Sequence, residues 1–398
     1  MQKVQTAVIG GGAAGICAAI SAKRSGRGVI ICERMPVLGK KILASGNGRC
    51  NLLNDELDAS RYNESARGLI RSVFARYGRK ELLDLFKGLG LPTYSDGGRI
   101  FPATNQASSV LKVLELELVR LAVPMELNFT VDTIHFSQGK FLVRSKSGKE
   151  LECENLIIAA GGRSYPALGS DGSCYRLVEK FGHKIVETVP ACVPLVVKDK
   201  LCHLLQGQKI FAKVKAVIDG KNACESKGDL LFTKYGLSGT AILDVSEAIS
   251  VAINRRPAKP AAVSVDIVPF MEAGALENEL AKRMEQHLPL QDLTAGILPN
   301  KFGFALKEEF QNTKASDIAA LLKNRIFKVI DTRGWNEAEF TAGGVDIKDI
   351  DERTLESRLV KGLYFAGEIL DVCGARGGYN LAWAWASGLA AGATVGHT

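Results

Sequence analysis

The sequence lacks the cysteine patterns that would indicate a structural metal site or a disulfide framework. None of its nine cysteines forms a Cys-x-x-Cys pair, and none has the spacing to histidine that zinc sites use. Nine is an odd number, and several of these cysteines lie in apolar stretches, where a free thiol behaves as a small hydrophobic side chain. We therefore expect no metal site, no structural disulfide and a reducing, cytoplasmic location.

Long hydrophobic runs are also missing. The most apolar helical segment, residues 381–395, is too short to span a bilayer and contains Ser387. The apolar run after Lys3 has no convincing signal-peptide cleavage site, and it fits the first strand of a nucleotide-binding domain. We expect no membrane span and no secretion signal.

Blocks of like charge are absent too. The chain has 51 basic and 43 acidic residues, a formal net charge of +8, and these charges are scattered along the sequence. Such an excess suits an anionic ligand or a weak encounter with nucleic acid, but a slightly basic solvated surface is the simpler interpretation. We expect a small-molecule substrate and no nucleic-acid partner, and the sequence predicts no oligomeric state.

The length and composition are those of a globular protein with more than one domain. A chain of 398 residues exceeds the roughly 250 to 300 residues at which single cores stop growing. Its 46% hydrophobic and 24% charged residues are ordinary for this class. The 41 glycines are abundant, and many of them form short clusters typical of nucleotide-contacting loops.

The N-terminal segment carries the glycine spacing of a dinucleotide-binding turn. An apolar strand ends at Gly10, and a helix-forming segment follows Gly15. Gly10 permits the tight turn, Gly12 lets a pyrophosphate approach the backbone, and Gly15 lets the helix pack closely on the strand. Ala13 and Ala14 lie at the helix start, where free N–H groups and a partial positive charge favour phosphate.

A second apolar strand, residues 29–32, ends at an acidic residue about 20 positions after the glycine turn. Glu33 is placed to accept hydrogen bonds from an adenosine ribose, with Arg34 beside it as a further contact. The glycine spacing alone also occurs in ordinary strand–turn–helix units. The strand, the helix and the acid together predict a dinucleotide site.

The C-terminal region again combines a strand with a helix. Residues 363–366 form an apolar strand followed by Gly367 and Glu368, and a helix begins at Gly378 and Tyr379. In a two-dinucleotide-binding flavoprotein fold, such an acid bonds a ribityl hydroxyl. The helix start then directs N–H groups at the flavin N1–C2=O edge, where reduced flavin gathers negative charge. A strand–helix join with a glycine cap would look similar, but its pairing with the N-terminal fingerprint favours FAD.

These elements predict an α/β protein with an insertion. A Rossmann-type FAD domain of the two-dinucleotide-binding kind, residues 1–189 and 341–398, is interrupted by a β-barrel-like domain, residues 190–270 and 326–340. Alternating and β-branched runs mark that insertion. Residues 271–325 show helical spacing instead, which predicts a small helical subdomain.

Eight ordered motifs resemble the bacterial three-domain FAD flavoproteins of the Haemophilus and YhiN type, a family that includes a bile-acid reductase subfamily. Several motifs in one order are far more specific than any single one, and they span almost the whole chain. The matching segments are residues 10–15 with Glu33, 39–51, 98–102, 160–170, 232–239, 341–345, 354–357 and 362–388.

The resemblance implies a set of residues that hold FAD non-covalently, because no covalent attachment signature is present. Gly10, Gly12, Gly15 and Glu33 would hold the ADP half of the cofactor. The other implied contacts are Lys41, Arg49, Cys50 and Asn51 at the pyrophosphate and isoalloxazine, Val131, Ala160 and Gly161 at the adenosine, Gly367 and Glu368 at the ribityl chain, and Tyr379, Asn380 and Leu381 at the pyrimidine edge, with Gly378 opening that helix.

The resemblance also implies the reaction. Members of this family reduce a conjugated C=C bond next to a 3-oxo group in bile acids, or oxidise small amino ketones. We expect NAD(P)H-linked reduction of a 3-oxo-Δ4 or Δ4,6 steroid-type enone, with flavin-dependent amine oxidation as the alternative. No second glycine fingerprint follows a strand, so NAD(P)H would dock only transiently.

Candidate proton donors for such a reduction are Tyr165, Arg376 and Tyr379, in loops expected to face the flavin. A phenol would act as the acid, and Arg376 would polarise a carbonyl or bind a carboxylate. Each of them could instead serve only loop packing. Cys373 stands where the family often has an acid, so that side chain is either a pocket wall or a redox thiol, and the substrate does not transfer from relatives.

Two other classes of protein stay open. A flavin-dependent RNA-modifying or RNA-binding protein would fit the charge of +8, but it needs a basic surface interleaved with aromatic residues, and the sequence shows none. FAD could also serve as a structural support without turnover.

Overall fold

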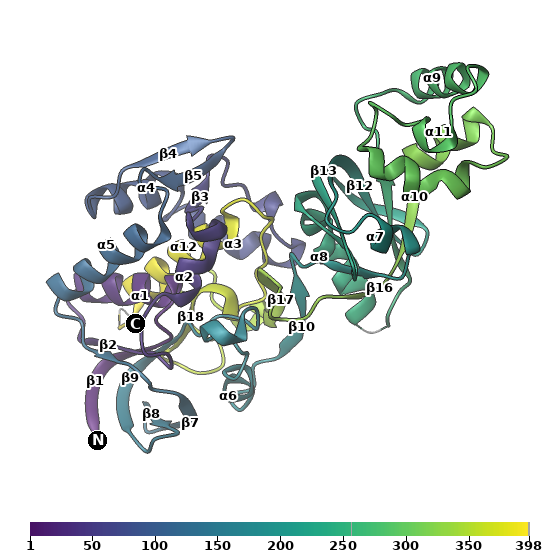
Figure 1. Cartoon of the computed structure of the whole chain (residues 1–398). Helices are drawn as coiled ribbons and strands as arrows, with labels where there is room; N and C mark the ends of the chain where they lie inside the picture. Colours follow the sequence, from purple (N-terminus) through teal and green to yellow (C-terminus); the bar gives the residue numbers. More distant parts are fainter. Residues whose placement is uncertain (256, 397–398) are drawn as a thin grey trace. The chain divides into compact units, whose positions relative to one another are not determined.

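The computed structural model describes residues 1–255 and 257–396, which belong to two compact units (Figure 1). Unit 1 consists of Met1–Thr188 and Phe340–Thr398, and unit 2 consists of Val189–Glu339. Each unit has its own cluster of buried hydrophobic side chains. β10 (Ile185–Ala191) and β17 (Phe340–Val345) pair as a two-stranded sheet where the chain passes from one unit to the other.

Unit 1 is built on a seven-stranded sheet in the order β6-β2-β1-β9-β8-β7, and β18 pairs with the end of β9. β6, β2, β1, β9 and β18 are parallel, whereas β7 and β8 continue the sheet antiparallel to β9. The strands of this sheet are β1 (Gln2–Ile9), β2 (Val29–Cys32), β6 (Met125–Glu126), β7 (Val131–Ser137), β8 (Lys140–Ser145), β9 (Glu150–Ile158) and β18 (Leu363–Phe365).

Two helices of unit 1 pack closely through glycine. A Cβ on Gly388 would lie closer than 3.0 Å to the carbonyl oxygen of Ala14, and a Cβ on Gly392 equally close to that of Ala18. The backbones of α1 and α12 therefore touch, as Figure 1 shows, and this fixes the two helix starts relative to one another. The helices of the unit are α1 (Ala13–Arg24), α2 (Lys40–Ala44), α3 (Arg67–Phe74), α4 (Arg79–Gly88), α5 (Ala107–Arg120), α6 (Tyr175–Glu179) and α12 (Tyr379–Thr394).

A small antiparallel sheet completes unit 1. It has the order β3-β5-β4, formed by β3 (Leu53–Asn54), β5 (Arg99–Pro102) and β4 (Thr93–Asp96). The turn between β4 and β5 is the pair Gly97 and Gly98, both with positive φ, which suits a two-residue hairpin. The buried side chains of Leu53 and Ile100 join the core of the unit.

Unit 2 contains a closed six-stranded barrel in the order β11-β14-β13-β12-β15-β16. Alternation along β12 puts Ala212, Val214 and Ala216 inside, where they are fully buried. The strands are β11 (Leu195–Val197), β12 (Lys209–Ile218), β13 (Lys221–Thr233), β14 (Gly236–Ser238), β15 (Ala261–Asp266) and β16 (Arg325–Thr332), and the helices are α7 (Lys200–Leu204), α8 (Thr240–Asn254), α9 (Ala273–Glu285), α10 (Asn300–Phe310) and α11 (Ala315–Lys323).

One helix of unit 2 differs from the sequence prediction. α8 lies inside the stretch predicted to be β-rich, a prediction that rested on the β-branched runs before and after it. Its buried residues Ile242, Val245 and Ile249 instead follow helical spacing and join the unit 2 core. In the predicted helical subdomain, α9 buries Leu276 and Leu280.

The predicted fold class is confirmed: an α/β Rossmann-type fold carries an inserted six-stranded barrel, and α9 to α11 follow the barrel strand β15. The proposed boundaries of three domains stay a prediction. Within the described ranges, no helix is both long and apolar enough to cross a bilayer.

The burial of the cysteines gives a first testable prediction. Eight of the nine are buried and Cys224 alone is exposed. We expect a thiol reagent to modify one cysteine in the native protein and nine after denaturation. Rapid modification of several thiols without unfolding would contradict the packing described here.

Candidate functional site

The carboxyl ends of parallel strands meet at one edge of the unit 1 sheet. Ile9 is in register with Cys32 and with Ile158, and Ile158 is in register with Phe365. Open α/β sheets bind ligands outside this edge. Residues predicted to bind the cofactor follow these strand ends: Gly10, Glu33, Ala160 and Gly367.

The glycine turn after β1 has the geometry that its spacing predicts. The Gly10 N–H donates to the Cys32 carbonyl at 2.9 Å, and Gly10 has φ +107°. A Cβ on Gly15 would lie closer than 3.0 Å to the Gly10 carbonyl oxygen, so the helix can approach the turn only with glycine there.

Gly12 differs from Gly10 and Gly15, because neither its backbone conformation nor a contact within the protein requires a glycine at this position. Its φ is −85°, and a Cβ there would meet nothing within 4 Å. Gly12 precedes α1, and the N–H groups of Gly12, Ala13 and Ala14 have no backbone acceptor among the described residues. Open space beside free N–H groups at a helix start suits a phosphate, as the sequence predicts.

Glu33 lies at the wall of a cavity next to this turn. The residue is 8% exposed, and its carboxylate accepts hydrogen bonds from the N–H groups of Gly11 at 2.6 Å and Met35 at 2.7 Å. Each oxygen keeps a further lone pair for a ribose hydroxyl. The cavity brings together six of the residues predicted to bind FAD, namely Gly10, Glu33, Arg34, Val131, Ala160 and Gly161.

Two further features make this cavity fit an adenosine. Arg34 is held beside it by Asp171, with 2.5 Å between guanidinium and carboxylate. The hydroxyl of Ser170 is buried and has no hydrogen-bond partner among the residues described, and it lies 2.9 Å from where a Cβ on Gly161 would be. Ser170 lies between Gly169 and Asp171, which line the cavity, and a buried, unsatisfied hydroxyl is costly, so a polar ligand group that reached it would stabilise it.

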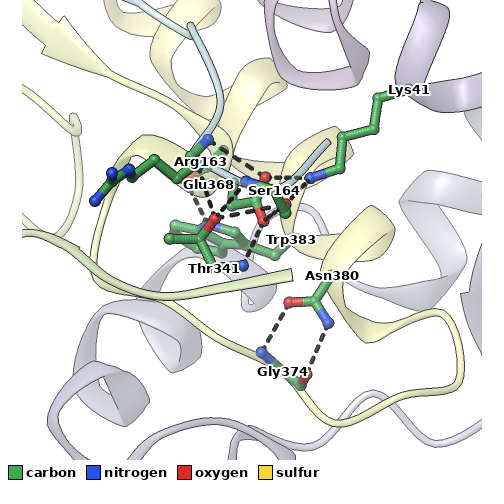
Figure 2. Close-up of polar contacts among 10 residues, drawn as sticks. Lys41, Arg163, Ser164, Thr341, Glu368, Gly374, Asn380 and Trp383 are labelled. Carbon is green, nitrogen blue, oxygen red and sulfur yellow. Dashed lines mark hydrogen bonds and ion pairs between the residues drawn. The ribbon is translucent and has the colours of Figure 1, made fainter. Parts of the chain in front are cut away.

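A second polar cluster forms around Glu368 (Figure 2). Lys41 donates from Nζ to Glu368 at 2.6 Å and to the Ser164 hydroxyl at 2.5 Å. The backbone N–H of Thr341 donates to Glu368 at 2.8 Å, and the Ser164 hydroxyl does so at 3.1 Å. The sequence predicts Lys41 and Glu368 as cofactor residues, and the structure joins them in an ion pair.

Thr341 anchors the loop that follows β9. Its hydroxyl accepts hydrogen bonds from the N–H groups of Arg163 at 2.8 Å and Ser164 at 3.1 Å. A Cβ on Gly162 would lie closer than 3.0 Å to this hydroxyl, so only a glycine fits there. Sequence reasoning placed Ser164 and Thr341 in motifs but gave them no role.

The start of α12 is the third part of the site. A Cβ on Gly378, at φ +98°, would lie closer than 3.0 Å to the backbone of Leu53. The Asn380 side chain bonds both backbone groups of Gly374, accepting at 2.8 Å and donating at 2.7 Å (Figure 2). The buried side-chain oxygen of Asn51 has no partner among the described residues. These fixed groups leave the first N–H groups of α12 available to an acceptor, as the predicted roles of Tyr379, Asn380 and Leu381 require.

Tyr379 is buried against a second phenol. Its ring is 5% exposed and lies edge-on to Tyr62, with 6.0 Å between ring centroids, and its carbonyl accepts the Tyr62 hydroxyl at 2.7 Å. Burial raises the pKa of both phenols, so Tyr379 is protonated at neutral pH. Tyr62 was missed by sequence reasoning, because no motif signals it.

Arg49 and Cys50 lie on a strained loop. Asn47 and Cys50 both have positive φ. The Arg49 guanidinium stacks 4.1 Å from the Phe101 ring centroid and donates to the Tyr94 hydroxyl at 2.9 Å. Cys50 is fully buried, and burial raises its pKa to about 12, so its thiol is inert.

The other two predicted catalytic residues lie on different segments. Arg376 belongs to the loop before α12. This loop is held by a hydrogen bond of 2.8 Å from the Ala375 N–H to the Arg61 carbonyl. Tyr165 follows Ser164 in the loop after β9 and has φ +57°. Cys373 is buried, with its backbone N–H bound to the Asn63 side chain at 2.9 Å.

Comparison with known proteins agrees with this geometry. The model of the HI0933-like protein Rossmann domain matches residues 4–394. The chain is 38% identical to a 3-dehydro-bile acid delta(4,6)-reductase of Clostridium scindens, over 97% of each chain. It is also 32% identical to the ribosomal RNA dihydrouridine synthase of Escherichia coli over 97% of this chain and 96% of that one. The enzyme of the same name from Haemophilus influenzae is 31% identical over 99% of each chain.

Solved structures show the same fold at low sequence identity. The 3-ketosteroid delta1-dehydrogenase of Sterolibacterium denitrificans aligns with a TM-score of 0.53 at 13% identity, over 98% of this chain and 99% of that one. A flavocytochrome c3 fumarate reductase aligns with a TM-score of 0.52 at 15% identity, over 99% of this chain and 78% of that one. With a family model that matches residues 4–394 and a relative that is 38% identical over 97% of this chain, the chain belongs to the HI0933-like Rossmann family and is an FAD-dependent oxidoreductase.

Proposed function

We propose that the chain reduces a C=C bond conjugated to a carbonyl, with NAD(P)H as a transient electron donor. The single observation that carries this proposal is the similarity to relatives whose named reactions have that bond in common. A 3-oxo-Δ4,6 steroid and the uracil ring both contain a C=C bond conjugated to a carbonyl. Conversion of uridine to dihydrouridine and reduction of the steroid each add two electrons and two protons across it.

The residues of this chain would bind and orient the reactants. FAD, when bound, supplies the hydride that the carbon β to the carbonyl receives. The Gly10–Gly15 turn and Glu33 would hold the ADP half, and Glu368 with Lys41 the ribityl side. The α carbon must gain a proton, and Tyr379, whose pKa is raised by burial, carries one at neutral pH. NAD(P)H is oxidised as the acceptor is reduced, which balances the electrons.

The first acceptor class we propose is a 3-oxo-Δ4 or Δ4,6 steroid of bile-acid type. It is supported by the relative that is 38% identical over 97% of both chains. Such a substrate is a small molecule, and the free, buried cysteines of this chain suit the cytoplasm as its location.

The second candidate acceptor is uridine in RNA, and one observation of this structure favours it. Arg49 stacks on Phe101 and binds the Tyr94 hydroxyl on one face of the β3-β5-β4 sheet. Phe101 is buried, whereas Arg49 and Tyr94 are partly exposed, and an arginine beside a phenol suits a phosphate or the edge of a base. The sequence showed no such surface, because Arg49 is 45 positions from Tyr94 along the chain.

The proposal is tested by product analysis. The FAD-loaded protein is incubated with NADH or NADPH and with either a 3-oxo-chol-4-enoic acid or ribosomal RNA transcribed without modification. Mass spectrometry should show a gain of two hydrogen atoms in one of these acceptors. If neither gains hydrogen, and an amine instead yields peroxide in air, the amine-oxidase alternative replaces this proposal.

A Tyr379→Phe variant tests the proton donor. The backbone carbonyl that binds Tyr62 and the ring contact both remain, so the fold should persist. We expect reduction of the acceptor to slow by about 100-fold or more, the usual contribution of a general acid, while reduction of the flavin by NAD(P)H is unchanged. Stopped-flow absorbance separates the two half-reactions. An unchanged acceptor step would remove Tyr379 from this role.

A further inference from the structure

A row of three polar side chains crosses the β3-β5-β4 sheet. Arg99, at the start of β5, is in register with Asn54 on β3 and with Asp96 on β4. Residues directly opposite each other in antiparallel strands project to the same face. This is also the face of Tyr94 and Phe101, against which Arg49 lies.

Arg99 is the member of this row without a partner of opposite charge. It is exposed, and among the residues that the structure describes no carboxylate lies within 4.0 Å of its guanidinium. Asp96, directly opposite, lies 3.9 Å from Arg49 instead. The nearby Arg61 faces Glu56 at 3.7 Å. The neighbouring acids are therefore directed to other arginines.

The turn before α12 forms a notch beside Arg99. A Cβ on Gly377 would lie 3.5 Å from the amide nitrogen of Asn54, 3.5 Å from the Tyr379 ring and 3.9 Å from the Arg99 Nε. Gly377 has φ +131° and no side chain, so these three groups converge on bare backbone, and the notch is the surface between them. The notch lies against the edge of the Tyr379 ring, which suits a phosphate on the sugar of a reacting uridine. A steroid side-chain carboxylate lies at the opposite end of the ring system from the reducible bond, so a steroid held here would need another residue to protonate its α carbon.

We propose that this notch binds an oxyanion of the substrate and that Arg99 is the residue that recognises it. This inference rests on the proposed function of the same site. A guanidinium presents a planar fork of N–H donors that matches a carboxylate or a phosphate. Asn54 donates one N–H to the Gly377 carbonyl at 3.0 Å and keeps a second for a ligand. The positive end of the α12 dipole favours an anion at the same place.

The chemistry of both acceptor classes supplies such a group away from the reducible bond. A bile-acid-type steroid carries a side-chain carboxylate, and a uridine in RNA is flanked by phosphodiesters. A neutral steroid and a free nucleoside carry neither. Arg99 would therefore select acidic acceptors, and its loss should remove that selectivity without removing the redox chemistry.

The test measures binding to the oxidised, FAD-loaded protein, in which no reduction takes place. Perturbation of the flavin absorption reports binding of two matched pairs of probes. The first pair is 3-oxo-chol-4-enoic acid and its methyl ester, and the second is a short uridine-containing oligoribonucleotide and uridine. The variants are Arg99→Gln, Arg99→Lys and, as a control, Arg176→Gln, which changes another exposed arginine on α6 that has no ion pair with the described residues.

We expect the wild type to bind the anionic member of one pair more tightly than its neutral partner. Arg99→Gln should weaken binding of that anion by about 10-fold or more and leave the neutral probe unchanged, whereas Arg99→Lys should restore part of the affinity. Arg176→Gln should match the wild type. The pair that shows this pattern identifies carboxylate or phosphodiester as the source of the oxyanion.

Three results would overturn the proposal. They are equal anion binding by Arg99→Gln and the wild type, equal weakening of the acid and the ester, and failure of the wild type to prefer either anion. FAD content and thermal unfolding of each variant exclude a folding defect. If Arg99-dependent binding is found but no acceptor is reduced, the oxyanion site stands and the proposed reaction fails.

Discussion

A Gly15→Ala protein is expected to lose FAD and to unfold at a clearly lower temperature than the wild type. The added Cβ would lie closer than 3.0 Å to the Gly10 carbonyl oxygen. Gly10 has little freedom to move away, because its N–H is bonded to the Cys32 carbonyl at 2.9 Å. Overpacking of this kind costs about 1 to 3 kcal/mol of unfolding free energy, and here it also distorts the turn that faces the phosphates.

Alanine variants at two other glycines distinguish loss of the cofactor from loss of the fold. A Cβ on Gly12 meets nothing within 4 Å, so Gly12→Ala should unfold like the wild type when both lack FAD. If the pyrophosphate lies beside Gly12, the methyl group displaces it, and FAD affinity should fall about 10-fold or more, which corresponds to about 1.4 kcal/mol. Gly88→Ala, at the end of α4 with nothing within 4 Å, should keep FAD and gain up to about 1 kcal/mol.

The measurements are FAD retention during gel filtration, read from the flavin absorption, and thermal unfolding of each apoprotein. A Gly12→Ala protein that binds FAD like the wild type would contradict a phosphate at this turn. A Gly15→Ala protein that unfolds like the wild type would contradict the close packing of α1 on the turn.

Glu368→Gln is expected to have the second large effect. The carboxylate accepts from Lys41 at 2.6 Å, from the Thr341 N–H at 2.8 Å and from the Ser164 hydroxyl at 3.1 Å. An amide has one acceptor oxygen in place of two and turns an N–H₂ group toward one of these donors. We expect the free energy of unfolding to fall by about 2 kcal/mol and FAD to bind about 10- to 100-fold more weakly.

A double-mutant cycle with Lys41→Met assigns this effect to the ion pair. The two single variants should each have a lower free energy of unfolding than the wild type. The loss in the double variant should be smaller than the sum of the two single losses by about 1 kcal/mol or more. Glu179→Gln is the control, since this acid lies exposed at the end of α6, away from the cluster. Additive losses, or equal stability of Glu368→Gln and the control, would show that the cluster does not act as a unit.

The parts of the site that sequence predicts best are those in which neighbours along the chain also meet in space. β2 spans Val29–Cys32 and α12 begins at Tyr379, both as the apolar pattern and the glycines indicate. In the first turn the end of β1 at Ile9, Gly10 and the start of α1 at Ala13 lie within about one helical turn of each other, so local rules decide the geometry there.

Contacts between distant segments could not be predicted in this way. Ser164 and Thr341 are 177 positions apart, and Ser164 and Glu368 are 204 apart, yet they share hydrogen bonds. The pairing of β9 with β18 brings the loops that carry Ser164 and Glu368 to the same edge of the sheet, and Thr341 joins them from β17. The partnership of Tyr62 with Tyr379, 317 positions away, is of the same kind.

The one long helix that the sequence reading missed, α8, shows a different limit. Its β-branched residues have a local preference for strands, and packing against the barrel core overrides it. Propensity is a weak guide where one side of a segment is buried against a core, as α8 is against the barrel strands that precede it.

The most direct test of the proposed reaction is anaerobic. The FAD-loaded protein is reduced with NADH or NADPH and then mixed with a conjugated acceptor, the 3-oxo-4-ene steroid acid or the uridine-containing RNA, and separately with the same molecule whose C=C bond is already saturated. We predict that one conjugated acceptor restores the absorption of oxidised flavin, with one acceptor reduced for each flavin oxidised, and that its saturated counterpart leaves the flavin reduced. A flavin that stays reduced with both conjugated acceptors would contradict the proposal.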